Sequence, residues 1–267
     1  MSSGYGTGEP LSYNKYLKVP ELIHLQETLS EPESHDELLF IIIHQTYELW
    51  FKQILHEMNR LQPALEAGDT PTVHAGFKRV LTVLKVLVAQ VDILETMTPV
   101  SFSSFRSRLE AASGFQSLQF RELEFVLGNR SAAMVSHHAD TPGGERLARR
   151  LAVPSLYRSF LGFLHSKGYA IPADAMDRDP SLPPLEDERV RRTLIRIYRE
   201  DPATREVCER LVDLDEGFQE WRYRHVKMVE RTIGAKTGTG GSSGAEYLRR
   251  TLFRPFFPDL WSIRSEL

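Results

Sequence analysis

The stretch HDELLFIIIHQTYELWFKQILHEMNRLQPALEAG, residues 35–68, contains one long amphipathic pattern that predicts the fold of the chain. Between about Asp36 and Leu65, apolar residues recur at steps of three and four, which is the period of an α-helix. Segment 38–43 is apolar on every side, so we expect this end of the helix to be buried. The stripe consists of Phe40, Ile43, Tyr47, Trp50, Phe51, Ile54, Met58 and Leu61.

Two further long helical patterns follow this stretch. After the sequence DTPT, with Thr70 as the expected N-cap and Pro71 in the first turn, a second apolar stripe spans residues 77–94. A third stripe spans residues 207–228, and Gly234 is a natural C-cap for it. Since no segment alternates convincingly at a period of two, the predicted fold class is all-α, a bundle of several long helices.

Shorter helical segments are expected between these long ones. One stops near Gly128, and others span about 155–169 and 186–200. There is no internal repeat and no linker that would separate a second domain, so we expect one domain over residues 13–267. Residues 1–12 are rich in glycine and serine and are expected to form a flexible N-terminus.

The bulk composition excludes several classes of protein. The 267 residues are 41% hydrophobic and 26% charged, which are ordinary globular values, and a net charge of −3 gives no reason to expect nucleic acid or an anionic membrane as a partner. The single cysteine, Cys208, excludes an internal disulfide and fits a reducing compartment. Without a signal peptide or an apolar run of about 20 residues, the sequence predicts a soluble, cytoplasmic protein.

A glycine-rich run, AKTGTGGSSGAEYL at residues 235–248, resembles a phosphate-binding loop only superficially. Its lysine, Lys236, precedes the glycines, whereas a phosphate-binding loop has its lysine after the last glycine and follows a strand. The dinucleotide fingerprint fails as well, because Ser243 stands where the third glycine belongs. The run is therefore either a surface loop or, because it follows the last long helix closely, a lid over a site on that helix.

Two of the nine histidines lie on apolar stripes. His44 is one turn from both Phe40 and Tyr47, and His225 is one turn after Trp221. Each histidine alone is compatible with an ordinary core residue, but two such residues on separate aromatic-lined helices favour a shared apolar pocket. Neither has a second histidine at chelating spacing and the chain has no cysteine pair, so a zinc or non-haem iron site is poorly supported. A neutral imidazole in an apolar cleft is suited to axial ligation of haem, held here without thioether links.

Four segments together resemble the tryptophan 2,3-dioxygenase family. They are HDELLFIIIHQTYELWFK, SSFRSRLEAASGFQSLQFRELE, WRYRHVKMVERTIGAKTGTGGSSG and the terminal FFPDLW. The resemblance extends from Tyr13 to Trp261 and is weakest between about Asn129 and Arg205. It implies an all-helical homotetramer with one haem b per subunit, ferrous in the active state. It also implies insertion of both atoms of O2 across the indole C2–C3 bond of L-tryptophan, giving N-formyl-L-kynurenine, the first step of the kynurenine pathway.

Matched position by position, the resemblance assigns roles around the haem. His225 matches the proximal iron ligand, and His44 matches the distal histidine that faces the indole N–H. Phe40 matches the aromatic residue against the indole ring. Ser113 matches the small distal residue above the haem.

The same resemblance assigns residues to the amino-acid end of the substrate. Arg106 matches the arginine that grips the carboxylate, which suits the planar guanidinium group. Thr239, in the glycine run, matches the residue that meets the α-amino and carboxylate groups, so the run is expected to close as a lid. Tyr13 and Tyr16 match tyrosines that reach into the site of a neighbouring subunit.

Two positions depart from part of the family. Phe102, on the substrate-binding wall, stands where some members have tyrosine, so a hydroxyl contact is absent there. Val91 stands where some members have a tryptophan beside the haem. Outside this reading, a haem-binding sensor without turnover and a haem-free helical interaction protein remain alternatives, as does a broader indoleamine dioxygenase within the enzyme class.

Overall fold

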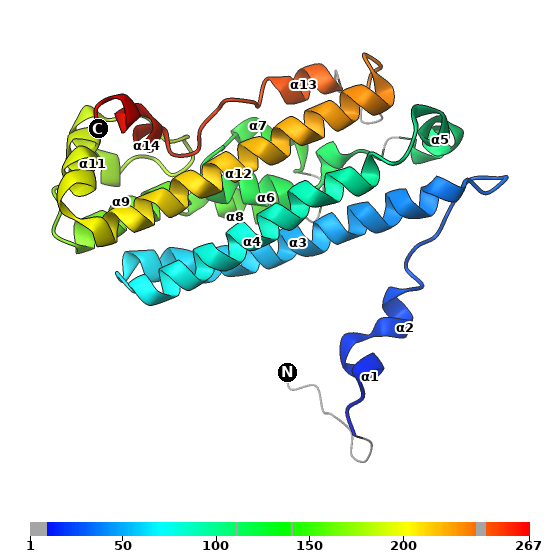
Figure 1. Cartoon of the computed structure of the whole chain (residues 1–267), viewed down its shortest axis with the longest axis horizontal. Helices are drawn as coiled ribbons and strands as arrows, with labels where there is room; N and C mark the ends of the chain where they lie inside the picture. Colours follow the sequence, from blue (N-terminus) through cyan, green and yellow to red (C-terminus); the bar gives the residue numbers. More distant parts are fainter. Residues whose placement is uncertain (1–9, 111, 140, 142, 239–243) are drawn as a thin grey trace.

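The computed structural model of the chain describes residues 10–110, 112–139, 141, 143–238 and 244–267. Three long helices dominate it: α3 (His35–Glu66), α4 (Thr70–Leu94) and α12 (Pro202–Ile233). They lie side by side along the length of the molecule, with α4 packed against both α3 and α12 (Figure 1). No strand occurs among the described residues, and the all-α prediction is confirmed.

The ends of the long helices follow local capping chemistry. The N-cap of α4 is Asp69 rather than Thr70, because its carboxylate accepts a hydrogen bond from the backbone N–H of Thr72 at 3.3 Å. Asp201 caps α12 in the same way, accepting from Ala203 and Thr204. That helix ends at Gly234, as predicted, where φ is +62° and a side chain would be strained.

Shorter helices cover the ends and one face of this layer (Figure 1). Gly128 ends α6 in a left-handed conformation, which agrees with the predicted stop at that residue. The helices are α5 (Pro99–Phe105), η1 (Arg106–Leu109), η2 (Gly114–Gln116), α6 (Leu118–Leu127), α7 (Ala132–His137), α8 (Gly144–Ala152), α9 (Leu156–Ser166), α10 (Ala173–Met176), α11 (Glu188–Glu200), α13 (Ala245–Arg249), α14 (Pro258–Ser262) and η3 (Ile263–Ser265).

The core consists of two clusters of buried apolar side chains. The larger one joins α3, α4, α9 and α12, and burial of each large side chain in it contributes about 1.5–3 kcal/mol. The smaller one lies where α5 meets α3 and α4, and includes Ile43, Phe102 and Phe105. Tyr47 and Met228 contact both clusters. The two clusters are therefore connected through the region between α3 and α12.

A buried carboxylate on α12 attaches the C-terminal segment to the bundle. Oδ2 of Asp215 accepts hydrogen bonds from the backbone N–H groups of Phe256 and Phe257 at 2.8 and 3.2 Å, and from the indole N–H of Trp261 at 3.0 Å. Burial raises the pKa of Asp215, and these hydrogen bonds oppose the rise. The segment FFPDLW is thereby held against the face of α12.

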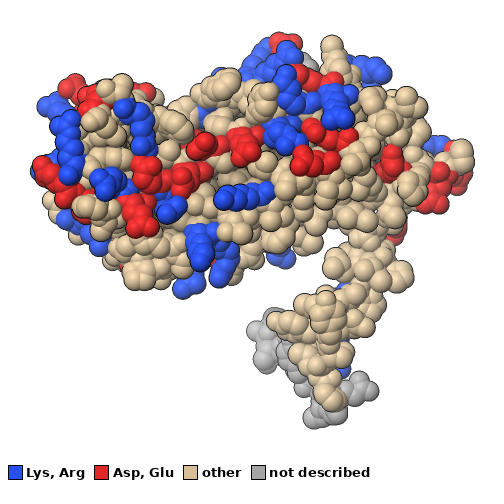
Figure 2. Space-filling view, in the orientation of Figure 1, with Lys and Arg blue, Asp and Glu red and all other residues tan. Residues whose placement is uncertain are grey.

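Residues 10–34, here called the N-terminal arm, extend away from the bundle and contain α1 (Tyr13–Leu17) and α2 (Val19–Leu22) (Figure 1). Its base is attached to α3, since Gln26 donates to Gln45 at 2.6 Å and Glu37 accepts from the backbone of Leu29 at 2.8 Å. On the face seen in Figure 2, the arm shows few charged side chains. Its exposed apolar side chains are Leu11, Tyr13, Tyr16, Leu17, Leu22, Ile23, Leu25 and Leu29.

Across the described part of the chain, no helix has both the length and the apolar composition that crossing a membrane requires. The division into a flexible segment 1–12 and one domain over 13–267 stays a prediction. Residues 1–9 lie outside the described residues.

Candidate functional site

A cavity of about 270 Å³ lies between α3, α6 and α12, at the end of the bundle where α5 packs. Its walls are mainly aromatic and aliphatic, and a few polar side chains enter it from different helices. The apolar lining includes Phe40, Tyr47, Phe51, Val91, Leu94, Met97, Phe102, Phe120, Trp221, Met228, Val229, Ile233 and Leu248. The polar and charged side chains are His44, Glu48, Arg106, Ser113, Ser117, Arg121, Glu124, Arg222, His225, Thr232 and Thr251.

His44 enters the cavity from α3 as a neutral imidazole with a defined tautomer. Its Nδ1 lies 2.7 Å from the backbone carbonyl oxygen of Phe40. Because a carbonyl only accepts hydrogen bonds, Nδ1 carries the proton and Nε2 of the neutral ring is an acceptor. Burial lowers the pKa of His44 below its ordinary value of 6.5, while the bond to Phe40 and the charge of Glu48 oppose that shift.

His225 lines the cavity from α12 and is also neutral. Burial lowers its pKa to about 4, with smaller contributions from His44 and Arg121. The ring stacks on Trp221, one turn earlier, with ring centroids 5.2 Å apart and an interplanar angle of 11°. The stacked indole restricts rotation of the imidazole, so an uncharged ring is held in a defined orientation.

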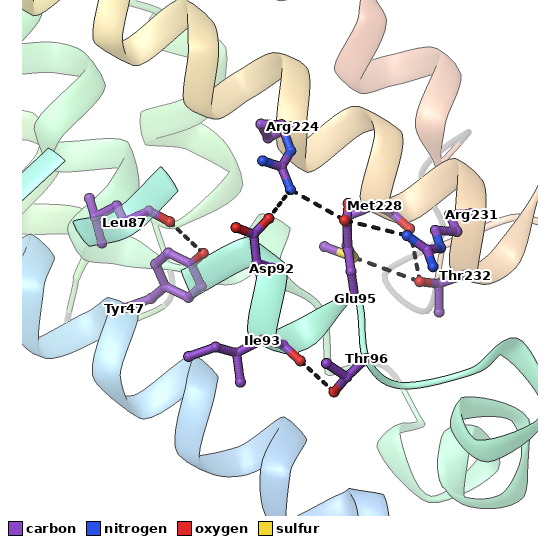
Figure 3. A network of polar contacts seen from close by, with 10 residues as sticks. All are labelled: Tyr47, Leu87, Asp92, Ile93, Glu95, Thr96, Arg224, Met228, Arg231 and Thr232. Atoms are coloured by element: carbon purple, nitrogen blue, oxygen red, sulfur yellow. Dashed lines mark hydrogen bonds and ion pairs between the residues drawn. The ribbon is translucent and has the colours of Figure 1, made fainter. Parts of the chain in front are cut away.

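Ion pairs on the outer side of the bundle hold α12 against α4 beside His225 (Figure 3). Arg224 contacts Asp92 at 2.5 Å and Glu95 at 3.2 Å, and Arg231 contacts Glu95 at 3.5 Å. Single exposed pairs contribute only about 0–1 kcal/mol. Because Arg224 precedes His225 and Arg231 follows it, their pairs together hold this part of α12 in register with α4, and with it the position of His225.

Arg106 enters the cavity just beyond the end of α5. One of its guanidinium nitrogens donates to the backbone carbonyl of Thr237 at 2.5 Å, so the arginine contacts the start of the glycine run. The neighbouring wall is an aromatic cluster. The ring centroid of Phe40 lies 4.0 Å from that of His44 and 5.8 Å from that of Phe102. A polar cation therefore borders an aromatic surface, which suits a ligand with an apolar ring and an anionic end.

The structure gathers most of the predicted site residues in this cavity. Six line it together: Phe40, His44, Phe102, Arg106, Ser113 and His225. Val91, the position that departs from part of the family, lines it as well. Tyr13 and Tyr16 do not, because they lie on the N-terminal arm, where 73% and 71% of their surfaces are exposed. Thr239 lies outside the described residues, as do residues 239–243 in the middle of the run 235–248 that was predicted to be a lid. Gly238, Gly244 and Leu248 of that run line the cavity.

Several lining residues were not assigned a role from the sequence, among them Arg121, Glu124, Trp221 and Arg222. Glu124 bonds Arg222 at 3.1 Å and Arg121 at 2.5 Å, and all three are buried. The indole N–H of Trp221 is buried and makes no hydrogen bond to the described residues. These residues lie in the segments SGFQSLQFRELE and WRYRH. Charged residues within helical segments that are otherwise apolar could have indicated them, since charged side chains are rarely buried without a partner.

The cavity can hold a planar apolar group against a nitrogen ligand. A bare metal ion has no group of three His, Cys, Asp or Glu side chains to hold it within the described ranges. The neutral His225, the aromatic walls and the N–H donors of Arg222 and Trp221 match a porphyrin with an axial imidazole and carboxylate substituents. The fold and site thus define an all-α protein with two neutral imidazoles in one aromatic cavity.

Comparison with known proteins gives the family. A family model described as Tryptophan 2,3-dioxygenase matches residues 4–159 and 189–267. Tryptophan 2,3-dioxygenase of Herpetosiphon aurantiacus is 57% identical over 259 residues, covering 97% of this chain and 99% of that protein. The proteins of the same name from Anaeromyxobacter dehalogenans and Kineococcus radiotolerans are 55% and 44% identical, each over 96% of this chain and over 96% and 91% of their own. The chain belongs to the tryptophan 2,3-dioxygenase family.

This result confirms the resemblance inferred from the sequence motifs, and with it the prediction of an all-α dioxygenase. The unmatched residues 160–188 fall within the region where the resemblance was weakest. They include the end of α9 and all of α10, which contribute no residue to the cavity lining.

Proposed function

We propose that this chain uses haem b to insert both atoms of O2 across the indole C2–C3 bond of L-tryptophan, forming N-formyl-L-kynurenine. The observation that carries the proposal is the arrangement of His44, His225 and Arg106 in one aromatic cavity of a chain of this family. The reaction is balanced, because the C2–C3 bond breaks and each carbon receives one oxygen atom. No external reductant is consumed in a cycle.

The residues present fit haem b. His225 would ligate the iron, because its ring is neutral and held by Trp221. The propionates would lie near Arg222 and Trp221, whose N–H groups suit carboxylate oxygens. Val91 and Ser113 would leave room beside the porphyrin, since both are small and line the cavity. When bound, haem b supplies the redox chemistry of dioxygen activation.

The chain's own residues bind and orient the substrate. Nε2 of His44 is placed to accept a hydrogen bond from the indole N–H, since its Nδ1 proton is already donated to Phe40. The indole N–H is a very weak acid, so His44 acts by positioning rather than as an obligatory base. The rings of Phe40 and Phe102 would pack against the indole and exclude water, and Arg106 would pair with the carboxylate.

The direct test is an assay of the haem-loaded, ferrous protein with L-tryptophan in air. We expect the absorbance of N-formylkynurenine to appear in step with oxygen uptake. A Soret band without product would indicate a haem-binding sensor, and no Soret band after haem addition would indicate a haem-free interaction protein. Equal turnover of D-tryptophan and tryptamine would indicate a broader indoleamine dioxygenase.

Substitution of His225 tests the proposed iron ligand. His225→Ala should purify with little haem and should recover part of the wild-type spectrum when imidazole is added, because the cavity then admits an external nitrogen ligand. His56→Ala, at an exposed position on α3, is the matched control and should keep its haem. Normal haem content and an unchanged spectrum in His225→Ala would exclude this assignment.

Substitution of Arg106 tests the carboxylate contact. Arg106→Ala should keep haem and lower kcat/KM for L-tryptophan. The loss should correspond to about 2–5 kcal/mol of transition-state stabilisation, since a desolvated carboxylate loses its partner. Activity on tryptamine, which has no carboxylate, should hardly change. Arg108→Ala, at an exposed position two residues on, is the control. The same ratio of tryptophan to tryptamine activity in wild type and Arg106→Ala would contradict the role.

We further infer that the enzyme is a cytoplasmic homotetramer in which the N-terminal arm reaches a neighbouring subunit. The arm exposes leucines and tyrosines, and its face seen in Figure 2 shows few charged side chains. Burial of such a surface against a second copy is favourable. Tyr13 and Tyr16 would then complete the partner's substrate site rather than the site of their own chain.

Deletion of the outer part of the arm tests whether the arm contributes to substrate binding and to assembly of the subunits. Deletion of residues 1–20 should weaken L-tryptophan binding much more than haem binding, because the haem ligand lies on α12. The double substitution of Tyr13 and Tyr16 by alanine should do the same, and the double substitution by phenylalanine, which keeps both rings, should do so less. Measurement of L-tryptophan affinity and of oligomeric state checks this. A stable monomer with full activity would refute the shared site.

A further inference from the structure

Glu48 enters the same cavity from α3, one turn after His44, and both of its carboxylate oxygens are engaged. Oε1 accepts a hydrogen bond from Oγ of Ser117 at 2.5 Å, and Oε2 accepts one from Nε2 of Gln119 at 2.8 Å. The Gln119 amide also lies 2.9 Å from the backbone carbonyl oxygen of Glu48. One side chain of α3 therefore holds two side chains at the beginning of α6.

Ser117, which donates to Glu48, is the last residue of a turn over residues 113–117 that forms part of the cavity wall. Ser117 caps α6, because its Oγ accepts from the backbone N–H of Phe120 at 3.2 Å while donating to Glu48. Just before it, Gln116 donates its backbone N–H to Ser113 at 2.9 Å, and Ser117 donates its own to Gly114 at 3.1 Å. The turn over residues 113–117 thus leads directly into the serine that Glu48 binds.

Glu48 also has a fixed position relative to His44 on the same helix. A single helical turn separates the two side chains on α3, so their spacing along the helix is fixed. Hydrogen bonds to an ionised carboxylate are stronger and shorter than those between neutral groups. Any movement of the 113–117 turn relative to His44 must therefore stretch or break the contacts of Glu48.

We propose that Glu48 is a positioning residue that sets the separation between His44 and the 113–117 turn, and so the width of the pocket for the indole ring. The inference rests on the proposed function. It assigns Glu48 to substrate positioning rather than to haem binding, because the carboxylate bonds Ser117 and Gln119 and not His225 itself.

The test compares Glu48 with a matched carboxylate on the same helix. Glu66 accepts a hydrogen bond from Oγ of Ser159 at 2.7 Å, about 27 Å farther along α3 and away from the cavity. Glu48→Ala, Glu48→Gln and Glu66→Gln would be compared with wild type in haem content, Tm, equilibrium binding of L-tryptophan, kcat and KM. Gln119→Ala breaks the contact from the α6 side and leaves the carboxylate in place.

Glu48→Ala should keep its haem and lose about ten- to a hundredfold in kcat/KM, the range known for small errors of substrate position. Glu48→Gln should lose less, because its amide oxygen still accepts from Ser117. Gln119→Ala should weaken L-tryptophan binding in the same direction, and it substitutes for Glu48→Ala if that variant does not fold. Glu66→Gln should lower Tm only.

Tryptophan binding and KM in the Glu48 and Gln119 variants equal to those of Glu66→Gln would overturn the inference. A wild-type protein without turnover would contradict the proposed function instead. Equilibrium binding of L-tryptophan would still distinguish Glu48 from Glu66 in that case.

Discussion

The packing of α4 between α3 and α12 is the constraint on which the rest of the structure depends. Over most of their length these helices bury large aliphatic and aromatic side chains against each other and against α9. At the end where α5 packs, the same stripes continue, but α3 presents His44 and α12 presents His225. The bundle therefore changes from a filled core to a cavity without any change in the helices themselves.

Desolvation gives this cavity its chemical character. Burial is the largest cause of the lowered pKa of both His44 and His225, so both rings stay uncharged at neutral pH. A neutral ring has one nitrogen without a proton, which His225 would offer to iron and His44 to an N–H donor. The charged groups at the cavity are Arg106, Glu48 and the buried group of Arg121, Glu124 and Arg222.

Carboxylates placed along α3 attach four other parts of the chain to it. Glu37 accepts from the backbone of the N-terminal arm, Glu48 from the start of α6, Glu57 from Arg79 on α4, and Glu66 from Ser159 on α9. These acceptors are spaced along a helix of 32 residues, so the segments they hold are kept in register with one another. Two of these attached segments, α4 and α6, contribute residues to the cavity wall.

The long helices could be predicted from the amino-acid sequence, because a period of three to four, a cap or a glycine at a helix end is local information. It also indicated His44 and His225, which stand out as polar residues on apolar stripes, and the family motifs pointed to Phe40, Phe102, Arg106 and Ser113. The shared pocket of the two histidines was also predicted from the sequence. The contacts of Glu48 between α3 and α6, and the buried group of Arg121, Glu124 and Arg222, became visible in the folded chain alone. The structure also shows Asp69, and not the expected Thr70, as the N-cap of α4. Both residue types are suitable N-caps, so the sequence could not distinguish these two neighbours. The physical reason is the range of the interactions: hydrogen bonds and desolvation depend on which helix faces meet, and a one-dimensional pattern states only what each face contains.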